Sequence, residues 1–114
     1  MEQVVKNCTG LVEVEKTFYM SFDGKRCVCT IPELYIDNAT AQMLVRYKQG
    51  DEEVYRLTST DGIRFTGKMG TDDDSRVDFD KWEKNGVVLL AGSWKCGGRE
   101  GEWYIEGTKE GFTQ

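Results

Sequence analysis

The sequence contains no histidine, a single proline and no apolar run longer than the stretch 87–91. Without imidazole, Ser-His-Asp and Cys-His catalysis, histidine metal ligands and histidine pH switches are all excluded. The apolar run is far shorter than the roughly 20 residues that a membrane-spanning helix needs. An enzyme of this composition would depend on carboxylates, tyrosine, lysine or cysteine, so we expect a protein without catalytic activity.

Concentrated positive charge is missing as well. The 114 residues carry a formal net charge of -5, and the densest basic pair is Lys25-Arg26. Nucleic-acid binding depends on basic side chains gathered on one face, because phosphate contacts supply most of the affinity. Anionic membrane surfaces attract the same kind of basic cluster. We therefore expect neither nucleic acid nor a membrane among the partners.

The cysteines lack the spacing of a metal site. Four are present, Cys8, Cys27, Cys29 and Cys96, and none belongs to the C-x2-C pairs from which four-cysteine zinc sites are usually built. We expect no metal and no cofactor, and we interpret Cys27 and Cys29 as small buried residues in a reducing compartment. The N-terminus lacks the basic and apolar segments of a signal peptide. This favours a cytoplasmic location; a trimmed secreted form and the redox state of the four cysteines stay open.

Apolar and polar residues alternate along most of the chain, as they do in half-buried strands. Turn signals separate the alternating stretches: Asp23-Gly24, Asp61-Gly62 and Asn85-Gly86 are dipeptides that tolerate positive φ in hairpins. The stretch 87–95 is apolar at successive positions, which is typical of a strand covered on both faces. The pattern predicts strands over the ranges 11–22, 26–31, 42–48, 53–58, 63–69, 76–83, 87–95 and 102–107.

The alternation is imperfect in the first of these strands and in the sixth. In 11–22, Val12, Val14 and Phe18 share one face, and Lys16 is a charged exception on that face. In 76–83, Trp82 falls out of phase with the apolar residues before it. A bulge near Lys81 would restore the phase of Trp82, because a bulge adds one residue to a strand.

Residues 32–41 admit two interpretations. Pro32 should end the strand before it, because proline cannot donate a hydrogen bond to a central ladder. Proline is also common in the first turn of a helix, so a short helix could follow. The alternative is an edge strand closed by a turn at Asp37-Asn38, and we favour the strand.

The regular spacing of strands and turns predicts an all-β fold. We expect a single antiparallel up-and-down barrel, or a barrel-like sandwich, of about seven or eight strands with at most one short helix. The chain 1–114 should form one domain, with its core in about 11–107 and a frayed tail over 108–114. The shared phase of neighbouring strands predicts these core residues: Ile63, Phe65, Met69, Val77, Phe79, Leu89 and Trp103.

The late strands carry Gly92-Ser93-Trp94 and Trp103. With this strand layout, the chain resembles the small calycin-type barrels, the lipocalins and avidins. The Gly-x-Trp motif of lipocalins belongs on the first strand, whereas here it lies near the C-terminus. The resemblance therefore implies a topology over 11–107 and carries over no functional residue.

Trp94, Trp103 and Arg99 form the candidate ligand site. If the glycine-rich loop 97–101 is a hairpin connection centred near Gly98 and Arg99, Trp94 lies almost opposite Trp103. One ring could then line the mouth of the barrel, with Arg99 above it as the polar group that orients a ligand. A pair of tryptophans that simply fills the core explains the same residues.

These observations favour a non-catalytic binding module. Its partner would be a small apolar or anionic ligand at the barrel mouth, or another protein. Two alternatives remain: a small histidine-free enzyme that uses carboxylate or tyrosine chemistry, and a structural protein that forms a homodimer through a sheet edge. The candidate carboxylates, among them Glu13 and Glu102, fall on outward faces, which argues against acid–base catalysis.

Overall fold

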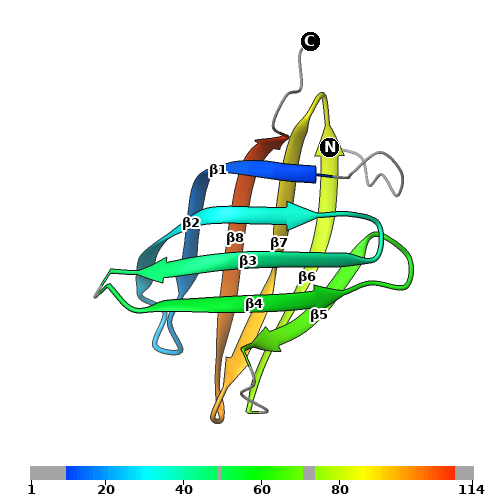
Figure 1. Ribbon diagram of the computed structural model, residues 1–114. Coiled ribbons are helices and arrows are strands. Elements are labelled where there is room, and N and C mark those ends of the chain that lie inside the picture. Colours follow the sequence, from blue (N-terminus) through cyan, green and yellow to red (C-terminus); the bar gives the residue numbers. More distant parts are fainter. Residues whose placement is uncertain (1–9, 49, 71–73, 110–114) are drawn as a thin grey trace.

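The computed structural model describes residues 10–48, 50–70 and 74–109, which form a closed barrel of eight strands (Figure 1). Each strand pairs antiparallel with the next, and the last pairs with the first. The predicted up-and-down antiparallel barrel is confirmed. No helix occurs in the described residues, and so none long and apolar enough to cross a membrane. The strands are β1 (Gly10–Met20), β2 (Arg26–Ile36), β3 (Thr40–Tyr47), β4 (Glu52–Thr58), β5 (Arg64–Met69), β6 (Ser75–Lys84), β7 (Val87–Cys96) and β8 (Arg99–Lys109).

The hairpin between β6 and β7 follows its turn signal. Asn85 and Gly86 both adopt positive φ, 51° and 79°, which is the conformation that a two-residue hairpin turn of matching twist requires. The hairpin between β7 and β8 is just as short: only Gly97 and Gly98 separate the strands, and Cys96 pairs with Arg99. The predicted loop 97–101 is therefore too long. At the C-terminal end, β8 extends through Lys109, whose N–H donates to the carbonyl of Gly86 at 2.8 Å; residues 110–114 lie outside the described part.

The barrel has two crossing layers, which β1 joins. In Figure 1, β2 to β4 run across the front of the view and β6 to β8 run up behind them, while β1 bends from one direction to the other. The register between β1 and β8 shifts between Val14 and Lys16, as at a β-bulge. Strands commonly turn such corners by means of bulges.

The bulge in β1 reverses the predicted face of the residues that follow it. Val14 faces inward before the bulge, and Thr17 and Tyr19 do so after it. Phe18 lies outside, stacked on Tyr104 with ring centroids 5.4 Å apart. The sequence-based placement of Phe18 on the inward face is wrong, because the extra residue changes the alternation by one position.

β2 continues through its proline. The strand runs to Ile36, and its register against β3 shifts between Thr30 and Glu33. Pro32 thus lies at an irregularity where no ladder hydrogen bond is required of it, and the expected strand end at Pro32 is wrong. The preference for a strand and a turn at Asp37-Asn38 is confirmed: Asp37 Oδ1 accepts hydrogen bonds from the N–H groups of Ala39 and Thr40, both at 2.8 Å, and closes the turn to β3. The expected edge position is wrong, because β2 pairs with both β1 and β3 in the closed barrel.

β6 has no bulge near Lys81. Its pairing with β7 is continuous, with Lys81 opposite Leu90 and Trp82 opposite Leu89. Lys81 is therefore inside the barrel and 0% exposed, whereas Trp82 and Leu89 lie half-buried on the outer face. The predicted bulge and the predicted burial of Leu89 are both wrong. A bulge would have directed the charged side chain of Lys81 outward. The continuous pairing of β6 with β7 leaves no extra residue from which a bulge could form.

The middle of the barrel is filled by side chains. Phe65, Val77, Phe79 and Trp103 are buried as predicted, while Ile63 and Met69 are half-buried. Phe65 lies opposite Phe79 on the neighbouring strand. Other fully or nearly fully buried side chains come from every layer: Leu34, Ile36, Met43, Val45, Leu57, Val88, Leu90 and Ile105.

Lys81→Met should increase the free energy of unfolding. The Lys81 Nζ has no hydrogen-bond partner among the described residues and lies 5.7 Å from the ring centroid of Phe65. Because a buried polar group without a partner is costly, its replacement by a similarly long apolar side chain is expected to add about 1–3 kcal/mol. Equilibrium unfolding in urea measures the change. Lys84→Met, on the same strand but exposed, is the control, with an effect within about 0.5 kcal/mol; a large loss of stability in Lys81→Met would contradict the prediction.

Candidate ligand-binding site at the barrel mouth

A cavity of about 210 Å³ opens at the end of the barrel where β1, β3, β5 and β7 finish. The alternation of each strand directs side chains inward at this end, and five of the eleven residues that line the cavity are aromatic. These aromatic residues are Tyr19, Tyr47, Tyr55, Trp94 and Trp103. The other lining residues are Met69, Ser75, Arg76, Val77, Lys95 and Cys96.

The aromatic rings hold one another edge to face. Tyr19 is the centre of the group, with ring centroids 6.0 Å from Tyr47, 6.3 Å from Trp94 and 5.8 Å from Trp103. Tyr55 meets Trp103 at 5.3 Å and an interplanar angle of 84°. Such tilted and T-shaped contacts are the favourable geometry for aromatic pairs. The ring positions are therefore set before any ligand arrives.

Both indole N–H groups are tied to β1. The Trp94 Nε1 donates to the carbonyl of Met20 at 2.9 Å, and the Trp103 Nε1 donates to Thr17 Oγ1 at 3.1 Å. Space for the Trp94 ring comes from Gly101, directly opposite on β8. A Cβ at Gly101 would lie 2.6 Å from the Trp94 Nε1, so the glycine lets the indole lie flat across its neighbour strand.

The hydroxyls of Tyr47 and Tyr55 form a hydrogen bond with each other. Burial raises the pKa of both phenols, that of Tyr55 to about 12, and the negative charge of Glu53 adds to the shift of Tyr55. Both phenols are therefore neutral at physiological pH. An unfolded chain would lose these protons near pH 10, so stability should fall as the pH rises from about 10 to 12.

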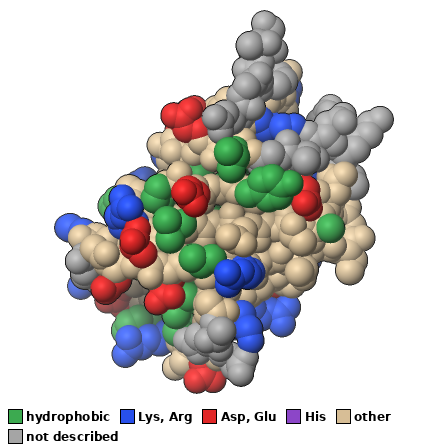
Figure 2. Space-filling view, in the orientation of Figure 1, with side chains coloured by type: hydrophobic (Ala, Val, Ile, Leu, Met, Phe, Trp, Pro, Cys, Tyr) green, Lys and Arg blue, Asp and Glu red, His purple; other side chains and the backbone are tan. Residues whose placement is uncertain are grey.

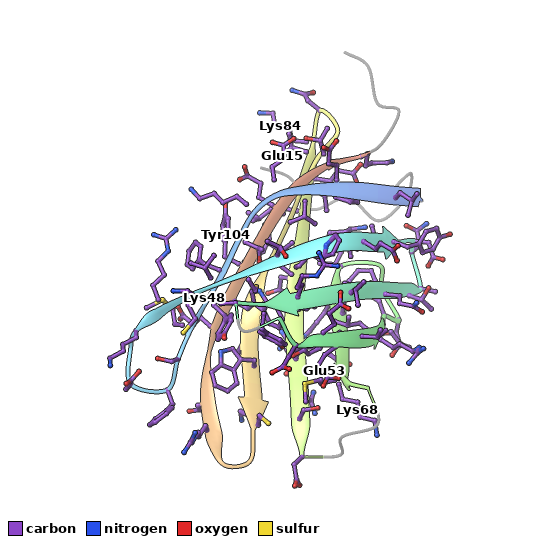
Figure 3. All side chains as sticks on the ribbon, turned by 60° about the vertical axis from the view of Figure 1, so that its left-hand side comes forward. Glu15, Lys48, Glu53, Lys68, Lys84 and Tyr104 are labelled. Carbon is purple, nitrogen blue, oxygen red and sulfur yellow. The ribbon has the colours of Figure 1, made fainter. Side chains whose placement is uncertain are left out.

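Charged side chains near the cavity point away from it. Arg76 and Lys95 border it, but each alternates with inward neighbours and has its charged group on the outer face. Arg76 Nε donates to Asp78 at 2.9 Å, and Lys95 lies 3.7 Å from Glu100. Glu53 on β4 is at the mouth end of the barrel in Figure 3. Among the described residues, the cavity lining thus contains no inward-pointing cationic group.

The structure brings two of the three predicted site residues together. Trp94 and Trp103 both line the cavity, although they are not opposite each other: Trp94 pairs with Gly101, and Trp103 pairs with Gly92. The two-residue offset arises because the hairpin turn is centred between the two glycines that precede Arg99. The guanidinium of Arg99 lies 4.5 Å from the ring centroid of Phe22, outside the cavity lining. Its role in orienting a ligand stays a prediction.

The tyrosines of the site were missed by sequence reasoning. Tyr47 and Tyr55 have the inward phase that alternation predicts, but only their contact across β3 and β4 shows them as a pair. Uninterrupted alternation from Val12 and Val14 would place Tyr19 on the outer face, and the bulge in β1 turns it inward. The sequence does contain one indication of that bulge, because the charged Lys16 interrupts the apolar face where the register shifts.

The cysteines offer little nucleophilic chemistry. Cys27, Cys29 and Cys96 form no disulfide, and Cys8 lies outside the described residues. Burial raises the pKa of the Cys29 thiol, which disfavours the reactive thiolate. Within the described ranges, no three cysteine or carboxylate side chains gather in a way that would hold a metal ion.

The chain has no significant match among protein-family models, curated proteins or solved structures. The resemblance to lipocalins and avidins therefore concerns the strand order alone. Function has to be inferred from the cavity.

Proposed function

We propose that this protein is a non-catalytic binding module that holds a small, mainly apolar aromatic molecule in the barrel mouth. The observation that carries the proposal is the cavity of about 210 Å³ with a wall of tyrosine and tryptophan rings. A dry apolar cavity of roughly 150 Å³ is large enough for benzene, whereas drug-sized ligands occupy about 300 Å³ or more. The cavity therefore suits one ring with a short substituent.

An apolar ligand fits better than an anionic one. Arg76 and Lys95 direct their charges to acidic partners outside, and Arg99 lies over Phe22. The negative charge of Glu53 acts on Tyr55 and raises the pKa of its phenol. A bound carboxylate would lose its hydration and gain no cationic partner, which is unfavourable in a low-dielectric site.

The alternatives receive less support. All eight strands have neighbours on both sides, so the closed barrel offers no free sheet edge for a homodimer. On the face shown in Figure 2, apolar side chains lie in small groups among charged ones, unlike a broad protein-docking patch. Enzyme chemistry through an ionised tyrosine is disfavoured, because burial keeps the phenols of Tyr47 and Tyr55 neutral. The absence of disulfides among Cys27, Cys29 and Cys96 fits the cytoplasm as the proposed location.

Cys96→Phe should weaken binding of toluene and ethylbenzene at least tenfold, about 1.4 kcal/mol. Cys96 lines the cavity at its mouth, so a phenylalanine there takes up the space of the ligand ring. Tryptophan fluorescence reports binding, because Trp94 and Trp103 form part of the wall. Lys84→Phe adds the same ring at an exposed position at the opposite end of the barrel, and should leave affinity unchanged.

Equal loss of affinity in Cys96→Phe and Lys84→Phe would show that the hydrocarbons do not bind in this cavity. If neither hydrocarbon perturbs the wild-type emission, nor shifts signals from Tyr19 or Tyr55 in an NMR titration, the proposed function is wrong. Arg99→Ala separately tests the predicted role of that side chain, and unchanged affinity would remove Arg99 from the site.

A further inference from the structure

The tyrosine pair in the described cavity wall has one more hydrogen-bond donor than its single bond uses. The two indole N–H groups donate to Met20 and Thr17. Ser75 Oγ in the same wall accepts the N–H of Met69 at 2.9 Å. The hydroxyls of Tyr47 and Tyr55 are bonded to each other.

A count of protons shows that the tyrosine pair is incomplete. Each phenol has one O–H proton, and a bond between two phenols uses one of the two. Neither Tyr47 nor Tyr55 has another side-chain or backbone hydrogen-bond partner in the described structure. One phenol proton is therefore left over beside the cavity that both rings line. A donor in this position is strengthened as well, because its oxygen already accepts a hydrogen bond from the other phenol.

We propose that the second phenol proton of the Tyr47–Tyr55 pair donates to an acceptor oxygen of the ligand, so that the site selects small neutral aromatic carbonyl compounds over hydrocarbons of the same shape. This inference rests on the proposed function. It identifies the substituent on the bound aromatic ring as a carbonyl group. The aromatic body packs against the tryptophans, and the carbonyl oxygen satisfies the donor. A buried donor that is left without an acceptor costs free energy. A carbonyl ligand avoids this cost and a hydrocarbon does not, so the carbonyl compound should bind more tightly.

The ligand acceptor is neutral. Glu53 places negative charge near Tyr55, and the net charge of the whole chain is -5. No inward-pointing lysine or arginine in the described lining offsets the desolvation of an anion. A ketone or aldehyde oxygen accepts the phenol proton without that cost. Benzoate, which has a ring of the same size, should therefore bind more weakly than acetophenone.

The test compares acetophenone with α-methylstyrene, in which a CH2 group replaces the carbonyl oxygen. Both dissociation constants are measured by tryptophan fluorescence for the wild type and for the double variant Tyr47→Phe/Tyr55→Phe. The ratio of the two constants is then compared between proteins, so that the different hydration of the probes cancels. We expect the preference for acetophenone to fall about fivefold in the double variant, as the loss of one hydrogen bond predicts.

The double variant should fold, because replacing both partners of a buried hydrogen bond with apolar groups of the same shape is nearly neutral. Tyr35→Phe is the matched control: it removes a phenol hydroxyl from an exposed outer position and should leave the ratio unchanged. Thermal unfolding of all three proteins, followed by circular dichroism, verifies that each is folded at the assay temperature.

The outcomes separate the two proposals. If α-methylstyrene binds and the ratio is the same in the wild type and the double variant, the carbonyl inference is wrong while the binding function stands. Benzoate binding more tightly than acetophenone would also overturn the inference, since it would require an anion site. If none of the three probes binds the wild-type cavity, the proposed function fails and the inference fails with it.

Discussion

Phe65→Ala should lower the free energy of unfolding by about 3–5 kcal/mol, the usual cost of removing a large side chain from a core. Phe65 is 0% exposed and pairs with Phe79 across β5 and β6. The cavity left behind would be closed in by β-strands that are hydrogen-bonded on both sides, so the wall has little freedom to collapse into it. Equilibrium unfolding in urea, followed by tryptophan emission, measures the loss.

The control is Phe22→Ala. Phe22 is 58% exposed beyond the end of β1, and its ring lies beneath the Arg99 guanidinium. Loss of that exposed contact should cost less than about 1 kcal/mol. Similar effects in the two variants would show that the ring of Phe65 does not fill the barrel interior, and the phase of β5 would have to be reversed.

Gly92→Ala should destabilise the barrel by about 3 kcal/mol, at the upper end of the usual cost of overpacking. A Cβ at this position would lie 1.7 Å from the carbonyl oxygen of Asp78 and 2.9 Å from the Cα of Phe79. Both contacts are with backbone atoms of β6, so no side-chain rotation can relieve them. The strands would have to separate or a bulge would have to form, with loss of ladder hydrogen bonds. Thermal and urea unfolding should agree on the change.

Ser93→Ala provides the comparison for Gly92→Ala. Ser93 is the next residue of β7 and lies half-buried on the opposite face of the strand, where its change should stay within about 0.5 kcal/mol. Wild-type stability in Gly92→Ala would mean that β6 and β7 approach each other less closely than the structure shows. Gly67 has a comparable environment, with a Cβ only 2.0 Å from the carbonyl oxygen of Arg56. A glycine within a strand indicates either a bulge or the close approach of another backbone, and at Gly67 the structure shows the close approach.

The two tryptophans of the site illustrate how far sequence reasoning reaches. The inward direction of Trp103 follows from local alternation, and the structure places both tryptophans in the cavity wall. Their relation to each other depends on the centre of one hairpin, and an error of one residue in that centre moves every cross-strand pair by two positions. The pairing of Tyr47 with Tyr55 could not be predicted from the sequence, because contact between two side chains depends on register, rotamers and the surrounding rings together.

The sequence by itself determined the strands, most of their inward faces and the short turns between them. These features depend on neighbours in the chain: side chains alternate with a period of two, and Asn85-Gly86 accepts positive φ wherever it occurs. Tertiary structure decided where strands bulge, that Lys81 lies inside, and that Tyr19 faces the cavity. A bulge or a buried charge depends on the hydrogen-bonded strand beside it and on closure of the barrel, and neither of these is a property of a single strand.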